Sequence, residues 1–209
     1  MHTEQLANPE LAAVEIDEMS RSDVIMKGAL AAGAVYGLSM VGPFLRQAFA
    51  QSGSGDVDIL NFALTLEYLE AAFYDEAKTK AKASGELQSL IELLAKDEAE
   101  HVTALDGAVK QLGGKPAPIP KVAFPYTDEK SFLELAVVLE DTGVSAYNGA
   151  APMIKSKDLL ATAGGIVQVE ARHAAAIRLQ AGESPAPESF DPTLTTDEVL
   201  SAVKPFIKS

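Results

Sequence analysis

The sequence predicts an all-α protein whose main domain is a four-helix bundle, made of two antiparallel helical hairpins joined by a long crossover. Three observations support this prediction. Over four long stretches the apolar residues recur every three to four positions, as they do along the buried side of a helix. Segments that contain Gly and Pro separate these stretches. None of the stretches alternates polar and apolar residues as a half-buried strand does.

The expected helices follow one another with clear stop and start signals. The second ends at Gly113 and Gly114, with prolines just beyond. Thr127 is expected to cap the third, because the two acidic residues after it suit the positive end of a helix. The expected spans are 56–82, 86–112, 128–150 and 156–181, followed by a short C-terminal helix that opens at Thr196.

Loop lengths predict how these helices are connected. Only a few residues join the first helix to the second and the third to the fourth, so each pair is expected to form an antiparallel hairpin. The proline-rich connection over 113–126 is much longer. It is long enough to cross the length of the bundle and to bring the second hairpin beside the first.

The N-terminal quarter of the chain is predicted to be a leader, separate from the bundle. A Ser-Gly linker at 52–55 has the composition of a flexible connection. It places the leader at 1–55 and the bundle domain with its tail at 56–209. The leader contains an apolar segment that is only weakly hydrophobic for a membrane-spanning helix, because it is rich in glycine.

Two interpretations of this leader remain open. Basic residues at its start, an uncharged stretch over 28–45 and the small residues of 48–50 are the parts of a secretory signal. Residues 20–27 resemble a twin-arginine export signal, although Ser22 stands where that signal has its second arginine. Export predicts a periplasmic protein. The alternative is a retained helix on a cytoplasmic protein, with membrane contact expected only through this segment.

Composition and charge exclude several classes of function. The 209 residues include 30 Asp and Glu against 17 Lys and Arg, a formal net charge of −13. This charge argues against nucleic acid or an anionic membrane surface as the main partner. The absence of cysteine from the sequence excludes disulfides, a thiol nucleophile and iron–sulfur clusters. Many carboxylates beside three histidines leave oxygen-rich metal binding as the chemistry to look for.

Two of the three histidines lie in the same short motif. His101 follows Glu98, and His173 follows Glu170, in both cases as Glu-x-x-His. Residues three apart project from one side of a helix about one turn apart, so both side chains of a motif can reach one cation. Each motif also interrupts an apolar stripe, where a carboxylate is unfavourable unless it is paired or binds a metal.

The two predicted hairpins repeat each other in sequence. Ala-Leu-Thr-Leu before Glu67 corresponds to Ala-Val-Val-Leu before Glu140, 73 positions later, and Tyr74 corresponds to Tyr147 at the same shift. The two Glu-x-x-His motifs are related by a shift of 72. Two such hairpins packed about a pseudo-twofold axis would bring four glutamates and two histidines to one point.

These motifs resemble those of the ferritin-like di-iron carboxylate proteins, and most closely those of bacterial ferritin-like domain proteins related to desiccation-associated proteins. The resemblance covers about 56–209 and rests on the segments 61–70, 139–144 and 169–173 and on the tail from Phe190. It implies a ferritin-like four-helix bundle that holds a dinuclear metal site.

By this resemblance and the internal repeat, six residues are expected to hold two metal ions. They are the bridging glutamates Glu98 and Glu170, the terminal glutamates Glu67 and Glu140, and one histidine per metal, His101 and His173. Four carboxylates balance the charge of two divalent cations. Carboxylate and imidazole without thiolate suit two iron ions, with manganese or zinc as alternatives.

Three further side chains are candidates for roles beside these ligands. Glu70 stands alone, because its repeat position holds Gly143. It is expected to support the ligands or lie at a solvated end of the bundle, with an extra ligand or an iron-entry carboxylate as the alternative. Tyr74 and Tyr147 are expected to be core tyrosines with satisfied hydroxyls. The alternatives are a hydroxyl bonded to a ligand from a neighbouring helix, or a redox-active tyrosine.

The function that follows from the resemblance is oxidation of Fe(II), or reduction of O2 or H2O2, in stress protection, by a ferroxidase- or peroxidase-type oxidoreductase. Three alternatives remain: manganese catalase-like dismutation of peroxide, a non-enzymatic metal-stabilised structural or stress protein, and iron storage in a shell. The expected partners are metal ions and O2 or H2O2, without nucleic acid, and a homo-oligomer is left open.

Overall fold

The computed structural model describes residues 55–208, and within that range the helices and strands assigned are all helices. This confirms the predicted all-α bundle. The predicted leader, with its export signal and most of its linker, lies outside the described residues. The long helices are α3 (Asp56–Lys80), α4 (Gly85–Gln111), α5 (Glu129–Ala150) and α6 (Lys157–Ala181), and the short ones are η3 (Ala151–Met153), α7 (Thr196–Val203) and η4 (Lys204–Phe206).

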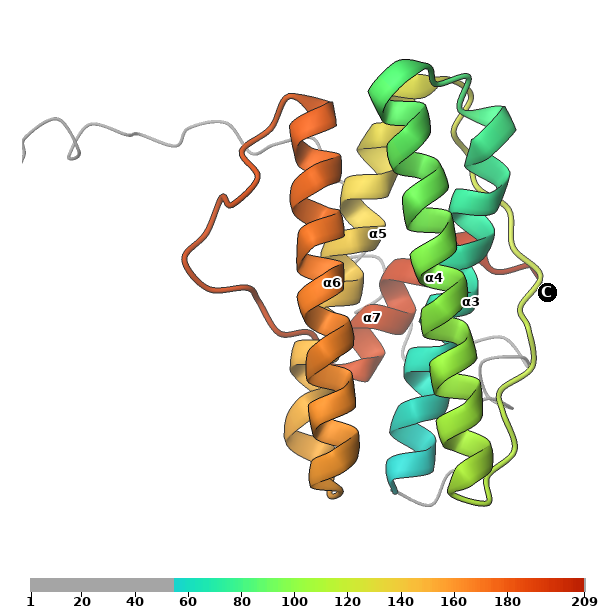
Figure 1. Ribbon diagram of the computed structural model, residues 1–209, viewed down its shortest axis with the longest axis vertical. Coiled ribbons are helices and arrows are strands. Elements are labelled where there is room, and N and C mark those ends of the chain that lie inside the picture. Colours follow the sequence, from blue (N-terminus) through green and yellow to red (C-terminus); the bar gives the residue numbers. More distant parts are fainter. Residues whose placement is uncertain (1–54, 209) are drawn as a thin grey trace, which may run out of the picture.

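The four long helices form two hairpins joined by a crossover that runs along the bundle (Figure 1). Helix α4 packs against α3, and α6 packs against α5. The crossover is held by the C-terminal tail, because the backbone N–H of Ala123 donates to the carbonyl of Phe206 at 2.9 Å and that of Lys208 donates to Lys121 at 2.8 Å. Among the described residues, no helix combines the length and the apolar character needed to cross a membrane.

The predicted cap of α5 was wrong by one residue. Asp128, and not Thr127, is the N-cap, and its Oδ1 accepts a hydrogen bond from the backbone N–H of Ser131 at 2.9 Å. The Ser131 hydroxyl in turn accepts from the backbone N–H of Asp128 at 3.2 Å. This reciprocal pair satisfies two groups that a helix start leaves without partners, which favours Asp128 over a lone threonine.

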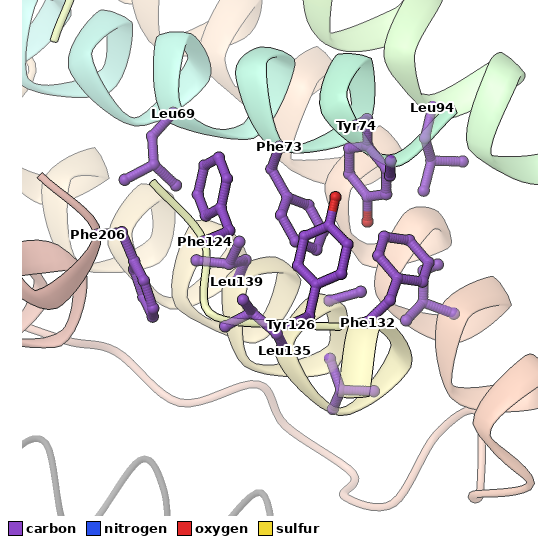
Figure 2. Close-up of a cluster of buried hydrophobic side chains, with 14 of the residues drawn as sticks. Leu69, Phe73, Tyr74, Leu94, Phe124, Tyr126, Phe132, Leu135, Leu139 and Phe206 are labelled. Atoms are coloured by element: carbon purple, nitrogen blue, oxygen red, sulfur yellow. The ribbon is translucent and has the colours of Figure 1, made fainter. Parts of the chain in front are cut away.

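The apolar core divides into two clusters. The aromatic cluster lies where the crossover meets α3 and α5, and Figure 2 shows its rings converging on Phe73. The Phe73 ring centroid lies 5.1 Å from those of Tyr74, Phe124 and Phe132. The second cluster includes Leu60, Ala63, Leu105, Tyr147 and Ala163. On α3, residues of these two clusters flank Glu67, so apolar packing encloses this part of the polar site.

Candidate metal centre

The structure brings all six predicted ligand side chains together inside the bundle. Each of the four long helices contributes a glutamate, and α4 and α6 also contribute the histidines. The four glutamates are fully buried, and the histidines are 9% and 5% exposed. Buried carboxylates on this scale are unfavourable unless they are paired with a cation or neutralised. The glutamates involved are Glu67, Glu98, Glu140 and Glu170, and the histidines are His101 and His173.

The donor atoms fall into two groups that share one residue. Within each group, one ligand atom per residue lies within 4.8 Å of the others. Glu98 belongs to both groups, which is the position expected of a bridging carboxylate. Glu170 belongs to one group, but its two oxygens approach both histidines, at 2.8 Å and 3.7 Å. The first group is Glu67, Glu98, His101 and Glu170, and the second is Glu98, Glu140 and His173.

Several of these close approaches are not hydrogen bonds. Nδ1 of His101 lies 2.8 Å from Glu170 Oε1, and Nδ1 of His173 lies 2.9 Å from Glu98 Oε1. Several of these atoms are nevertheless buried without a hydrogen-bond partner. They are Oε1 of Glu170, Oε1 of Glu98, Nδ1 of His173, Oε2 of Glu67 and Oε2 of Glu140. Such atoms are costly in a protein interior. Cations in the space that they share would satisfy them, so the donor set fits a metal site.

In the metal-free centre, protons do the work of neutralising charge that bound cations would otherwise do. Burial raises the pKa of Glu67 and of Glu140 well above the usual value. Burial acts to raise the pKa of Glu98 too, but the close approach of both histidines outweighs it and lowers the pKa to about 2. Burial acts to lower the histidine pKa values, yet the neighbouring carboxylates raise them to about 12 for His101 and about 11 for His173. Protons therefore neutralise the metal-free centre, and metal binding must release them.

The two tyrosines orient the terminal glutamates. The hydroxyl of Tyr74 on α3 donates to Glu140 Oε1 on α5, and the hydroxyl of Tyr147 on α5 donates to Glu67 Oε1 on α3. Each bond engages one carboxylate oxygen and leaves Oε2 facing the centre. Burial raises the pKa of both tyrosines well above the usual value, so they remain donors. The hydroxyls are thus bonded to candidate ligands, and a redox role stays a prediction.

Glu70 lies inside the protein, and the suggestion that it lies at a solvated end of the bundle was wrong. It is 3% exposed, and burial followed by the charges of the site glutamates raises its pKa well above the usual value. Its carboxylate occupies the space beside Gly143, where an added Cβ would lie 2.9 Å from Glu70 Oε1. The missing side chain at Gly143 therefore makes room for Glu70. Support of the ligands and direct ligation both remain open to it.

Sequence reasoning did not find Asp97. Its Oδ2 lies 3.4 Å from Nε2 of His173, the ring nitrogen that faces away from the other ligands. A carboxylate in this position fixes the ring and makes the histidine a stronger ligand. The signal was present, since Asp97 directly precedes Glu98, but the internal repeat concealed it because the corresponding position holds Val169.

A cleft lined by both charged and apolar residues leads, between α4 and α6, to the two histidines. Its volume is about 420 Å³, and both His101 and His173 line it. Asp97, Glu100 and Arg172 supply its charged groups, while leucines of α4 form the rest of one wall. The cleft gives small polar molecules a path from the surface to the imidazole side of the centre.

Comparison with known proteins agrees with this geometry. A family model described as a ferritin-like domain matches residues 55–183. The matched region contains α3, α4, α5 and α6 and therefore all six converging side chains. No curated protein matches the chain.

Proposed function

The chain belongs to the family of ferritin-like domains, and from this we propose that it is a dinuclear metal protein that uses two iron ions to reduce O2 or H2O2. The observation that supports this most strongly is the pair of donor groups that share Glu98. A single cation would leave either His101 or His173 without a metal, whereas a pair uses all six side chains.

The donor set favours iron. Four carboxylates and two imidazoles without thiolate suit Fe(II) or Mn(II), and two divalent ions neutralise four carboxylates. When bound, two ferrous ions supply the two electrons that reduce O2 to H2O2, or H2O2 to two water molecules, with two protons taken up in either reaction.

The protein's own residues hold and shield this centre. The hydroxyls of Tyr74 and Tyr147 each fix one carboxylate oxygen, so that Glu140 and Glu67 present the other oxygen to the metal. Apolar clusters on both sides keep bulk water away and strengthen every charge interaction inside. Water and peroxide are expected to reach the centre through the cleft that His101 and His173 line.

Anaerobic metal titration of the full chain tests the proposal. We expect two Fe(II) per chain, followed by a transient absorbance when O2 or H2O2 is added. Glu98→Ala combined with Glu170→Ala should abolish binding, because it removes the groups that face both histidines. The matched control is Glu92→Ala combined with Asp158→Ala, which removes two exposed carboxylates from the same two helices. A stoichiometry near zero for both iron and manganese in the wild-type protein contradicts the proposal.

A further inference from the structure

An apolar cavity lies beside the second cluster, and Phe62, Leu66 and Ala146 of the first cluster also line it. All four long helices line it, with Ala63, Leu105, Ala146, Tyr147 and Ala163 among the residues. It leaves about 20 Å³ in which the centre of a water-sized molecule can move. Thr162 and the Tyr147 hydroxyl supply the polar side-chain atoms of the lining. Both are occupied, because Thr162 donates to the carbonyl of Asp158 and Tyr147 donates to Glu67.

The internal repeat explains why this space is empty. Phe73 in the first half corresponds to Ala146 in the second at the shift of 73, and Ile91 corresponds to Ala163 at the shift of 72. Phe73 and Ile91 are both fully buried, and Figure 2 shows Phe73 filling the centre of the aromatic cluster. Two alanines at the equivalent positions leave the other end of the bundle underfilled. The cavity therefore lies where the second half of the repeat holds alanines.

The cavity reaches the candidate metal centre through one residue. Tyr147 lines the cavity and also donates its hydrogen bond to Glu67, which belongs to the donor group of His101. The cleft reaches the centre separately, between α4 and α6, and shares none of the residues that line the cavity. Charged side chains line the cleft and none line the cavity, so the two spaces beside the same site differ in chemical character.

We propose that this cavity binds one molecule of a small apolar gas, and that dioxygen is its occupant in function. A water molecule needs about 10–15 Å³ by the same measure and two to four polar partners. The cavity has the room for one small molecule, and the two hydroxyls in its lining already donate elsewhere, so it offers water no side-chain donor and favours an apolar guest. An acyl chain or a ring system is too large for it. The choice of dioxygen rests on the function proposed above, whereas gas binding itself does not.

Xenon, an apolar gas of similar size, tests the cavity without metal or turnover. Xenon NMR titration of the full-length, metal-free protein should show saturable binding of one atom per chain. Ala163→Ile should weaken this binding at least tenfold, because it restores the bulk that Ile91 supplies in the first half. Ala163→Val, a smaller change, should weaken it in the same direction if isoleucine overpacks the site. The matched control is Ala161→Ile, which lies on α6 at an exposed position and should leave xenon binding unchanged.

Two xenon results overturn the proposal. One is a wild-type protein without saturable binding. The other is equal binding by the wild-type, Ala163→Val and Ala163→Ile proteins, which would locate the xenon elsewhere.

The choice of dioxygen has its own test in the iron-loaded protein. Ala163→Ile should slow oxidation by O2 about tenfold and leave oxidation by H2O2 unchanged, since peroxide is polar and the cleft is open to it. Iron stoichiometry should stay at the wild-type value in this variant. Equal slowing with both oxidants would show a structural effect and overturn dioxygen as the occupant. If the wild-type protein binds no iron, the proposed function fails, while xenon binding still decides the gas cavity.

Discussion

The two hairpins carry the same donors in different surroundings. Each supplies a glutamate, a Glu-x-x-His motif and a tyrosine that bonds the other hairpin's glutamate. Four related pairs around these donors differ, namely Phe73 and Ala146, Ile91 and Ala163, Glu70 and Gly143, and Asp97 and Val169. In every pair the first hairpin has the larger or charged residue. The repeat therefore gives the centre a symmetrical set of donors, whereas the packing and the charge around the centre differ between the two hairpins.

The differences are complementary in space. The carboxylate of Glu70 from the first hairpin occupies the room that Gly143 leaves in the second. Phe73 fills the centre of the aromatic cluster, whereas Ala146, its equivalent in the repeat, lines the cavity. Two identical hairpins would place two carboxylates, or two glycines, at the same contact. Departure from symmetry thus leaves one end of the bundle filled by aromatic side chains and the other with a cavity.

Phe73→Ala is expected to have the largest effect, because it would make the packed end resemble the underfilled end. Removing a fully buried phenylalanine costs about 3–5 kcal/mol of stability. Denaturant unfolding of the metal-free protein measures this loss, and Phe190→Ala, at a side chain 90% exposed, is the control. Phe73→Leu serves if the alanine variant does not fold. A loss below about 1 kcal/mol for Phe73→Ala would contradict the contrast between the two ends.

His101→Ala and His173→Ala should each remove one of the two metals. Each histidine belongs to only one donor group, while Glu98 belongs to both. Loss of an outer partner weakens metal binding about 10–100-fold, so loss of a ligand should exceed about 100-fold at one metal. Titration should then give one tightly bound metal per chain for either variant. Loss of both metals in either single variant would mean that the two groups are not separable.

The helices and the two Glu-x-x-His motifs could be predicted because their signals are local, whereas Glu67 and Glu140 were predicted from the internal repeat and the family resemblance. Helical periodicity, glycine stops and Glu-x-x-His spacing all lie within a few residues of one another. The cap at Asp128 was missed by one position because two neighbouring residues can both cap, and only the reciprocal bond with Ser131 decides between them.

The features that sequence reasoning missed depend on contacts between distant residues. Asp97 meets His173 across 76 positions, and its own neighbours do not reveal this. The burial of Glu70 depends on the absence of a side chain at Gly143, on another helix. The cavity depends on small residues from four helices being brought together. None of these is visible until the packing of the hairpins is known.

Glu70→Gln should stabilise the metal-free protein, by roughly 1–3 kcal/mol at pH 7, because folding must either keep Glu70 protonated or bury its charge, and glutamine requires neither. The folded-state pKa of Glu70 is raised above the usual value of 4.5, so ionisation destabilises the folded state as pH rises above about 4.5. The gain from Glu70→Gln should therefore be small near pH 4.5 and grow towards pH 8. Denaturant unfolding across this range measures it, with the exposed Glu92→Gln as control. A gain that shrinks as pH rises would contradict the assignment.

Asp97→Val is expected to have the smallest effect, and it removes one of the four differences between the hairpins. Asp97 meets Nε2 of His173 at 3.4 Å and its side chain is 27% exposed, so its support is weaker than that of a buried partner. We expect about tenfold weaker binding of the metal in the His173 group, which is the lower end for such partners, and no change in the His101 group. Stepwise calorimetric titration with Mn(II) measures the dissociation constant of each of the two metals.

Val169→Asp is the reciprocal change, because Val169 holds the position in the second hairpin that Asp97 holds in the first, and both line the same cleft. If a carboxylate at this position acts by orienting one histidine, Val169→Asp should strengthen the His101 group alone. The double variant Asp97→Val with Val169→Asp should then exchange the environments of the two metals. The dissociation constant of the metal in the His173 group should rise, and that of the metal in the His101 group should fall. If Asp97→Val instead weakens both groups equally, Asp97 acts through the charge of the whole cleft, and the two metals are equivalent despite the asymmetry around them.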